Sequence, residues 1–163
     1  MEHVVIRRLE HLTGSAERPS LAYAVETRDR PGPAYKAGTS PGEGVWIQLH
    51  GGLLVARANI TLGWVGEYSS VAAVRARTKG AAIHDVEDLW KGRPRFGYAV
   101  VASLEHERWI DPFWGGPRTY QYEWVTLEDE KKRAAWLEPR EPPRGGGRLL
   151  EEFRAWLAAR EEE

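Results

Sequence analysis

Residues 44–60, GVWIQLHGGLLVARANI, constrain the fold more than any other segment of the chain. Two apolar stretches flank the pair Gly51 and Gly52, and glycines supply the positive φ angles that a two-residue β-hairpin turn requires. Such a turn pairs Gln48 with Val55 and Trp46 with Arg57. We therefore expect an antiparallel hairpin whose register is set by the two glycines.

Side chains alternate across a strand, so this register divides the hairpin into two faces. The apolar face is expected to build the core, and it consists of Val45, Ile47, Leu49, Leu54, Ala56, Ala58 and Ile60. The opposite face carries Trp46, Gln48, His50, Arg57 and Asn59. Arg57 thereby lies across from Trp46, where its guanidinium can stack on the indole.

The rest of the chain alternates short apolar strands with segments rich in Pro and Gly. Apolar patterning predicts strands over residues 4–9, 21–27, 98–104 and 119–127. Helices are expected over residues 81–90 and, after a capping box at Thr126 and Asp129, as far as Leu137, while residues 71–78 fit either strand or helix. The segments 28–44, 61–70 and 109–118 are expected to be loops, and a loop as long as the first is often functional.

This order lacks the regular alternation of strand and helix that a parallel sheet needs. We expect an α+β protein, a small and mostly antiparallel pseudo-barrel with short flanking helices, over residues 1–138. A Pro/Gly linker, residues 139–147, leads to an amphipathic helix at residues 148–163. Its apolar face carries Leu149, Leu150, Phe153, Trp156 and Leu157. That face either packs on its own domain or forms a homodimer.

Composition excludes several classes of function. The 163 residues are 42% hydrophobic and 29% charged, which suits one folded domain rather than a disordered chain. The absence of cysteine excludes disulfides and thiolate metal sites, and the five histidines show no metal-ligand spacing, so we expect neither metal nor cofactor. No signal peptide and no apolar run of about 20 residues is present. We therefore expect a cytoplasmic protein that does not enter membranes.

Aromatic residues are the unusual feature, with eight tryptophans in the chain. Four of them fit the core, namely Trp90, Trp124, Trp136 and Trp156. Other aromatics fall in the predicted loops near cationic residues, and these are Trp64, Tyr68, Trp109, Phe113 and Trp114. Loop aromatics beside Arg and Lys suit stacking on an unpaired base whose phosphates the cations hold. The alternative is that these rings close the open ends of the barrel.

Three stretches resemble a known group of domains. GEGVWIQLHGGLLVARANI resembles the hairpin of PUA-like domains, especially of the ASCH and EVE families, and RFGYAVVASLEHERWIDPFW with RTYQYEWVTLED resembles their closing strands. The resemblance covers about residues 21–137. It implies a pseudo-barrel of roughly five or six strands with a cleft between barrel and helices. In many PUA-like domains that cleft receives RNA or a modified nucleobase.

By this resemblance the cleft is expected to lie between residues 28–39, 64–70 and 109–121. The residues expected to bind there would stack on a base, hydrogen-bond to its edges or contact phosphate. They are Arg57, Asn59, Trp64, Tyr68, Ser69, Ser70, Trp114, Arg118 and Gln121. We therefore expect binding of a nucleic acid, preferably RNA, or of a modified nucleobase.

Two other functions stay open. Some ASCH-like proteins are hydrolases, and the resemblance then implies a Lys-Thr-Glu set that Lys36, Thr39 and either Glu43 or Glu67 would supply. Lys and Glu would exchange protons while Thr acts as nucleophile on a modified nucleoside or on RNA. The third function is a protein-interaction module that uses the apolar face of the last helix.

Overall fold

A computed structural model describes residues 1–20, 22–117, 122–145 and 147–161. In these ranges six strands form one sheet in the order β2-β5-β4-β3-β1-β6. The strands are β1 (Glu2–Arg7), β2 (Tyr23–Arg28), β3 (Gly44–Leu49), β4 (Leu53–Tyr68), β5 (Gly97–Trp114) and β6 (Trp124–Leu127). The helices are α1 (Pro33–Ala37), α2 (Val71–Ala76), α3 (Glu87–Trp90), α4 (Glu130–Leu137) and α5 (Gly147–Glu161), with the 3₁₀ turns η1 (Leu9–His11) and η2 (Ala82–Asp85).

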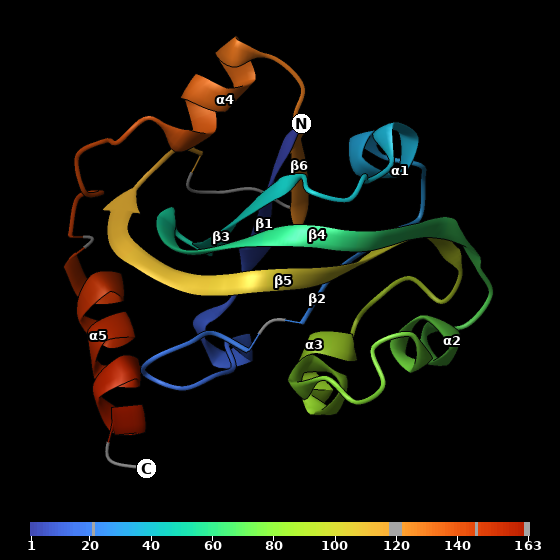
Figure 1. Cartoon of the computed structure of the whole chain (residues 1–163), viewed down its shortest axis with the longest axis horizontal. Coiled ribbons are helices and arrows are strands. Elements are labelled where there is room, and N and C mark those ends of the chain that lie inside the picture. Colours follow the sequence, from blue (N-terminus) through green and yellow to red (C-terminus); the bar gives the residue numbers. More distant parts are fainter. Residues whose placement is uncertain (21, 118–121, 146, 162–163) are drawn as a thin grey trace.

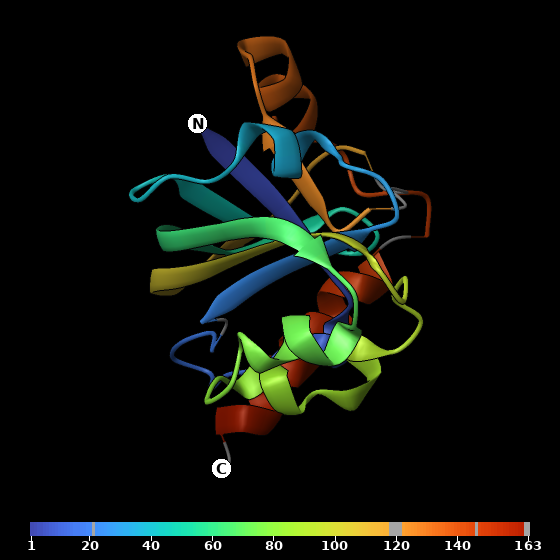
Figure 2. The same cartoon turned by 90° about the vertical axis from the view of Figure 1, so that its right-hand side faces the viewer.

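The sheet is mixed but mainly antiparallel. β1 and β3 pair in parallel, whereas the other neighbouring pairs are antiparallel. β4 and β5 are the longest strands, and both curve across the molecule (Figure 1). The side view in Figure 2 shows the sheet curled into a half-barrel. The predicted α+β class and the mostly antiparallel pairing are therefore confirmed.

The central hairpin forms as predicted at its base and differs at its tip. Trp46 faces Arg57 and Ile47 faces Ala56, as expected, but Gln48 faces Leu54 because Val55 is an extra residue in a β-bulge. The connection then has three residues, and Gly51 and Gly52 take φ angles of 114° and 106°. The bulge shifts the pattern by one residue, so Leu54 leaves the predicted face and packs beneath α4.

Two predicted loops are wrong, because residues 61–68 and 109–114 continue β4 and β5. Their glycines and polar residues suggest turns, yet Gly63 pairs with Ala102 and Glu67 pairs with Tyr98. Glycine is required at position 63 for another reason: a Cβ atom there would lie 1.5 Å from the Thr39 hydroxyl. Long-range pairing with a partner strand overrides these local turn preferences.

The helices differ in detail from the sequence predictions. Residues 71–76 are helical, and the Ser70 side chain caps them by accepting from the Ala73 amide. The predicted helix 81–90 is broken at Val86 into η2 and α3. The segment 28–44, predicted as a loop, contains α1. α4 begins one turn later than the predicted capping box, with Asp129 as its N-cap.

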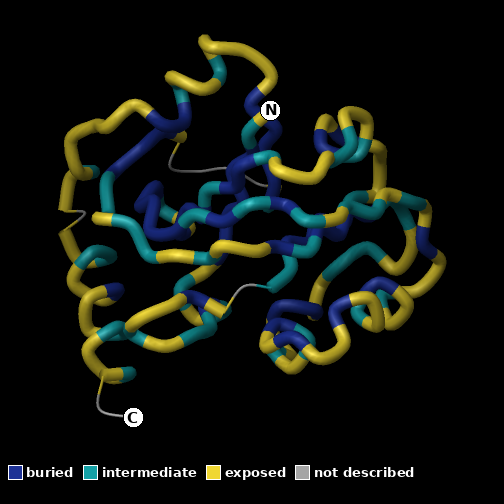
Figure 3. Tube along the Cα trace, viewed as in Figure 1, coloured by how far each residue is buried: buried dark blue, intermediate teal, exposed yellow. Residues whose placement is uncertain are grey.

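The C-terminal helix packs on the barrel. Phe153 is 1% exposed and belongs to the same core as the aliphatic face of the hairpin. Trp109 on β5 makes edge contacts with the rings of Phe153 and Trp156, at centroid distances of 5.5 Å and 5.6 Å. Figure 3 shows buried positions along the sheet and exposed positions on the outer side of α5. The apolar face of α5 is thus covered within one chain.

Candidate functional site

A cavity of about 600 Å³ opens where the half-barrel is incomplete, between β1, β2 and the segment that joins α3 to β5. Its lining comes from five separate parts of the chain, namely Val5, Ile6, Arg7, Arg8, His11, Val25, Glu26, Thr27, Arg28, His50, Asp88, Leu89, Lys91, Gly92, Arg93, Pro94, Tyr122 and Glu123. Five of these residues are Lys or Arg and three are Asp or Glu, so cations predominate.

Glu123, the residue before the edge strand β6, connects β1 to the edge strand β2 at this opening. Its carbonyl oxygen accepts from the amide of Ile6 on β1 at 2.9 Å, and its carboxylate accepts from the amide of Thr27 on β2 at 3.2 Å. Arg93 makes a two-pronged ion pair with the same carboxylate, with 3.0 Å between Nη2 and Oε2. A side chain thus takes the place of the strand that would close the barrel.

The guanidinium of Arg93 makes four hydrogen bonds in this arrangement. Besides the Glu123 carboxylate, Nη1 donates to the Thr27 hydroxyl at 3.0 Å and Nε donates to the Leu89 carbonyl at 2.9 Å. The Arg93 side chain is 8% exposed. It is therefore a structural cation of the cavity wall, and each of its three nitrogens donates to a protein acceptor.

Arg7 differs from Arg93 in one respect. It is 6% exposed, it lines the cavity, and its Nη1 atom has no hydrogen-bond partner in the described part of the chain. Burial lowers the pKa of Arg7 to about 10, and the carboxylates of Glu123 and Glu107 oppose that shift. The cavity wall therefore contains a buried cationic donor, Nη1 of Arg7, that none of the described residues accepts from.

Glu26 is the complementary group on β2. It is 1% exposed, the Trp124 amide donates to it, and its Oε2 atom is unpaired among the described residues. Burial raises the pKa of Glu26 to about 7, although Arg28 opposes the shift. At neutral pH this carboxyl group is divided between its protonated and ionised forms, so it can either donate or accept a hydrogen bond.

The rim of the cavity carries stacking and charged groups. The Arg28 guanidinium lies over the Tyr122 ring, 3.4 Å from its centroid. His11 contacts the Asp88 carboxylate at 2.8 Å, and that hydrogen bond lowers the pKa of Asp88. Arg8 and Lys91 are exposed at the rim. A planar cation on an aromatic ring beside exposed cations is a suitable setting for a base and its phosphates.

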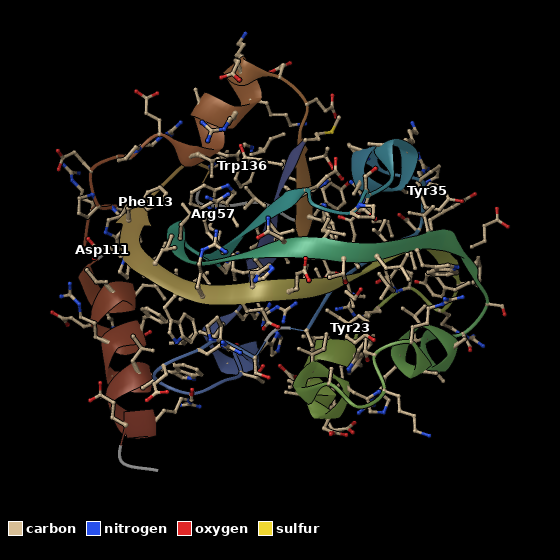
Figure 4. All side chains as sticks on the ribbon, in the orientation of Figure 1. Tyr23, Tyr35, Arg57, Asp111, Phe113 and Trp136 are labelled. Atoms are coloured by element: carbon tan, nitrogen blue, oxygen red, sulfur yellow. The ribbon has the colours of Figure 1, made fainter. Side chains whose placement is uncertain are left out.

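Arg57 lies where the sequence predicts it, on a different part of the molecule. Its guanidinium is 3.9 Å from the centroid of the Trp46 ring, which confirms the predicted stacking. Glu2 completes this cluster, because its carboxylate accepts from Trp46 Nε1 at 2.7 Å and contacts Arg57 Nη2 at 3.5 Å. Figure 4 shows Arg57 on the same side of β4 as Phe113 and Trp136.

Several other predicted binding residues have structural contacts of their own. The Arg77 guanidinium covers the Trp64 ring at 3.4 Å. The buried Tyr68 donates its hydroxyl to the Pro94 carbonyl at 2.7 Å, and Ser70 caps α2, while Ser69 is exposed beside it.

The remaining predicted binding residues are dispersed. Asn59 pairs with Gly44 and Glu105 within the sheet, and Trp114 is 7% exposed in the core. Arg118 and Gln121 lie outside the described residues. Within the described ranges, no member of the predicted set lines the cavity. A base-binding role for these residues stays a prediction.

The predicted catalytic set is dispersed, with Lys36 on α1, Thr39 and Glu43 between α1 and β3, and Glu67 on β4. Lys36 and Glu67 are exposed, and the Thr39 hydroxyl is enclosed against Gly63 without a partner among the described residues. Glu67 follows Gly63 by four residues on the same strand, a separation of roughly 13 Å. Glu43 instead contacts His3 at 3.1 Å and the N-terminal ammonium at 3.4 Å. Catalysis by this set also stays a prediction.

Sequence reasoning did not select the charged residues of the cavity. Glu26 lies between the buried residues Val25 and Thr27, and a charged residue in an apolar strand is the signal that identifies it. Arg7 ends the apolar run of β1 and is followed by the exposed Arg8, so its signal is weaker. Glu123 and Arg93 carry no such signal, because their roles depend on which distant segments meet.

The described ranges lack a metal-binding cluster and a membrane-spanning helix. No group of three or more His, Asp or Glu side chains there could hold a metal ion, and no helix is long and apolar enough to cross a membrane. Comparison with family models, with curated proteins and with solved structures finds no match for this chain. The resemblance to PUA-like domains therefore stays a prediction.

Proposed function

We propose that this protein binds a nucleic acid, preferably RNA, or a modified nucleobase, and that the cavity between β1 and β2 receives it. One observation carries the proposal: a cavity large enough for a small ligand is lined by five Lys or Arg side chains against three Asp or Glu. Two of these acids are already paired, Glu123 with Arg93 and Asp88 with His11. Five Lys or Arg against three Asp or Glu give the lining a formal charge of +2 with neutral histidines, which suits an anionic ligand.

The kinds of group at the cavity suit a nucleotide better than a simple anion. Arg28 and Tyr122 form a flat stack at the rim, and guanidinium planes and aromatic rings are the surfaces on which proteins stack unpaired bases. The exposed cations Arg8 and Lys91 can follow a phosphate backbone. Glu26 can form hydrogen bonds with the edge of a base, a group that a nucleotide has and that inorganic phosphate lacks.

Fluorescence anisotropy with a labelled single-stranded RNA of about eight nucleotides tests this proposal. Binding is expected to be about 20-fold weaker at 200 mM than at 50 mM salt, the change that follows from neutralising about three phosphates. The same sequence as DNA, and free modified nucleosides as competitors, distinguish the three ligand classes. No salt-dependent binding of RNA or DNA, together with no binding of nucleosides, would contradict the proposal.

A pair of matched variants locates the binding. Arg8→Ser with Lys91→Ser removes two exposed cations of the rim and is expected to weaken RNA binding by about tenfold or more. Lys131→Ser with Arg154→Ser removes the same two charges from exposed positions on α4 and α5. The second pair is expected to leave affinity nearly unchanged. Equal losses in the two pairs would show that net charge, not the cavity, attracts the RNA.

A further inference from the structure

We infer that the ligand unit held inside the cavity is a single nucleotide that carries a terminal phosphate monoester, with the phosphate directed toward Arg7. A free nucleoside monophosphate and the phosphorylated end of an RNA share this chemistry. The inference rests on the proposed function and adds to it the part of the ligand that enters the cavity.

The first support is the difference between the two buried arginines. Arg93 donates through Nε, Nη1 and Nη2 to protein acceptors, and it holds the Glu123 carboxylate with two hydrogen bonds. Arg7 Nη1 lacks a partner among the residues that the structure describes. A buried donor without a partner destabilises the fold, so its retention is explained if a ligand supplies the acceptor. Phosphate is the oxygen-rich anion that matches a guanidinium.

The second support is the depth at which the Arg7 side chain lies in the cavity. Arg7 is only 6% exposed although it lines the cavity, so its guanidinium lies in the wall and not at the rim. A phosphodiester inside a chain has a nucleoside on each side, and both would have to enter the cavity before the phosphate reached Arg7. A terminal phosphate has one nucleoside behind it. The recess therefore selects a chain end or a free nucleotide.

The third support is the unpaired carboxyl oxygen of Glu26 in the same cavity. A ligand that satisfies both groups must combine an anionic part with a polar edge that exchanges hydrogen bonds. A nucleotide has both, whereas inorganic phosphate lacks the edge and a nucleoside lacks the anion. The volume of about 600 Å³ lies in the range of sites that hold one small molecule.

Competition against a labelled, phosphorylated RNA tests the inference. The competitors are unlabelled RNAs of one sequence with a 5′-phosphate, a 3′-phosphate or hydroxyls at both ends, and also a nucleoside monophosphate, its nucleoside and inorganic phosphate. The RNA with one of the two phosphorylated ends is expected to have an inhibition constant about tenfold lower than that of the hydroxyl-ended RNA. The inhibition constant of the monophosphate is expected to be lower than that of its nucleoside by a similar factor.

The outcomes separate this inference from the proposed function. Equal competition by the phosphorylated and hydroxyl-ended RNAs would overturn the terminal-phosphate inference and leave RNA binding intact. If the monophosphate binds and RNA does not, the inference holds for a free nucleotide and the nucleic-acid part of the proposed function fails. Absence of binding by every competitor and by the labelled RNA would overturn both.

Substitution of Arg7 assigns the effect to that residue. Arg7→Met keeps an unbranched side chain but removes the guanidinium and its charge, and it is expected to abolish the preference for phosphate while Tm stays equal or rises. Arg7→Lys is expected to keep part of the preference, and Arg154→Met on the surface of α5 serves as the matched control. A lower Tm with the phosphate preference retained would show that Arg7 is structural. The comparison of RNA ends on the wild-type protein does not depend on whether either variant folds.

Discussion

Arg7 and Glu26 are buried ionisable groups that the fold does not fully satisfy. Each lies within a strand, each is less than a tenth exposed, and each has one polar atom without a partner within the described ranges. Burying such groups costs free energy unless a partner compensates. Their presence at one cavity is the main reason to regard that cavity as a site and not as a packing defect.

The titration of Glu26 gives a stability prediction with a defined sign. Its pKa is about 7 in the folded protein against 4.5 in the unfolded chain, so the folded state binds more protons between these values. Stability from this group is therefore complete below about pH 4.5 and is lost as pH rises toward about 7. Glu26→Gln removes the titration. The free energy of unfolding of the variant, relative to wild type, is expected to increase by up to about 3 kcal/mol between about pH 4 and pH 8.

Urea denaturation of both proteins across this pH range measures the effect. The comparison between variant and wild type cancels the titration of other groups, including Glu2, Glu43, Glu87 and Asp88, whose pKa values are lowered. A constant difference between the two proteins over the range would mean that Glu26 is not buried as described.

The connection between β1 and β2 depends on Glu123. Its carboxylate is held by Arg93, whose side chain is 8% exposed, and it accepts from the Thr27 amide. Glu123→Ala leaves a buried cation without its partner, so we expect a loss of about 3–5 kcal/mol in the free energy of unfolding. Hydrogen exchange at the Thr27 amide is expected to become faster in the same variant.

Glu128→Ala is the control for this measurement, because Glu128 is half exposed and its carboxylate lies 3.8 Å from the Lys132 ammonium. It is expected to change stability by less than about 0.5 kcal/mol. Similar small effects of both substitutions, with the Thr27 amide still protected, would show that the opening is held together in another way.

The contribution of α5 to the stability of the fold can be tested at Phe153. Phe153 is buried against Trp109 and the barrel core, so Phe153→Ala is expected to cost about 3–5 kcal/mol in the free energy of unfolding. Because the face is covered within one chain, the loss should not vary with protein concentration. A loss that depends on concentration would place this face between two copies of the chain, as in the predicted homodimer.

The strands and helices that sequence predicts well are those with local, regular patterns. The apolar face of the central hairpin and the apolar face of α5 follow directly from residue spacing. The bulge at Val55 and the extension of β4 through Gly63 and Gly66 do not, because they depend on pairing with β5. Local composition around these glycines favours a turn, and tertiary pairing decides otherwise.

The candidate site was less predictable than the fold. The stacking of Arg57 on Trp46 follows from the hairpin register, and it is observed. The cavity, however, joins residues near positions 7, 26, 91 and 123, and nothing in the local sequence indicates that these segments meet. Buried charges inside apolar strands, such as Glu26 in β2, are the sequence feature that points most directly to it.

The molecule as a whole is a half-barrel with two different kinds of closure. Along most of its length apolar side chains from α4, α5 and the segment carrying α2 and α3 cover the sheet, in three buried clusters. At the opening between β1 and β2, charged side chains take over this role. Because charged side chains line this opening, it contains a cavity with an excess of positive charge. The proposed binding of a nucleotide rests on this cavity.

The most direct test is an NMR titration of the isotope-labelled protein with a single-stranded, end-phosphorylated RNA of about eight nucleotides. The amide signals of Arg8, Thr27, Arg28, Lys91 and Gly92 are expected to shift together and to saturate with one affinity, because these residues line the cavity. Signals around Trp64 and Arg57 are expected to stay in place. Shifts centred on Trp64 and Arg57, with the cavity signals unchanged, would contradict the assignment and return the site to the residues that sequence alone suggests.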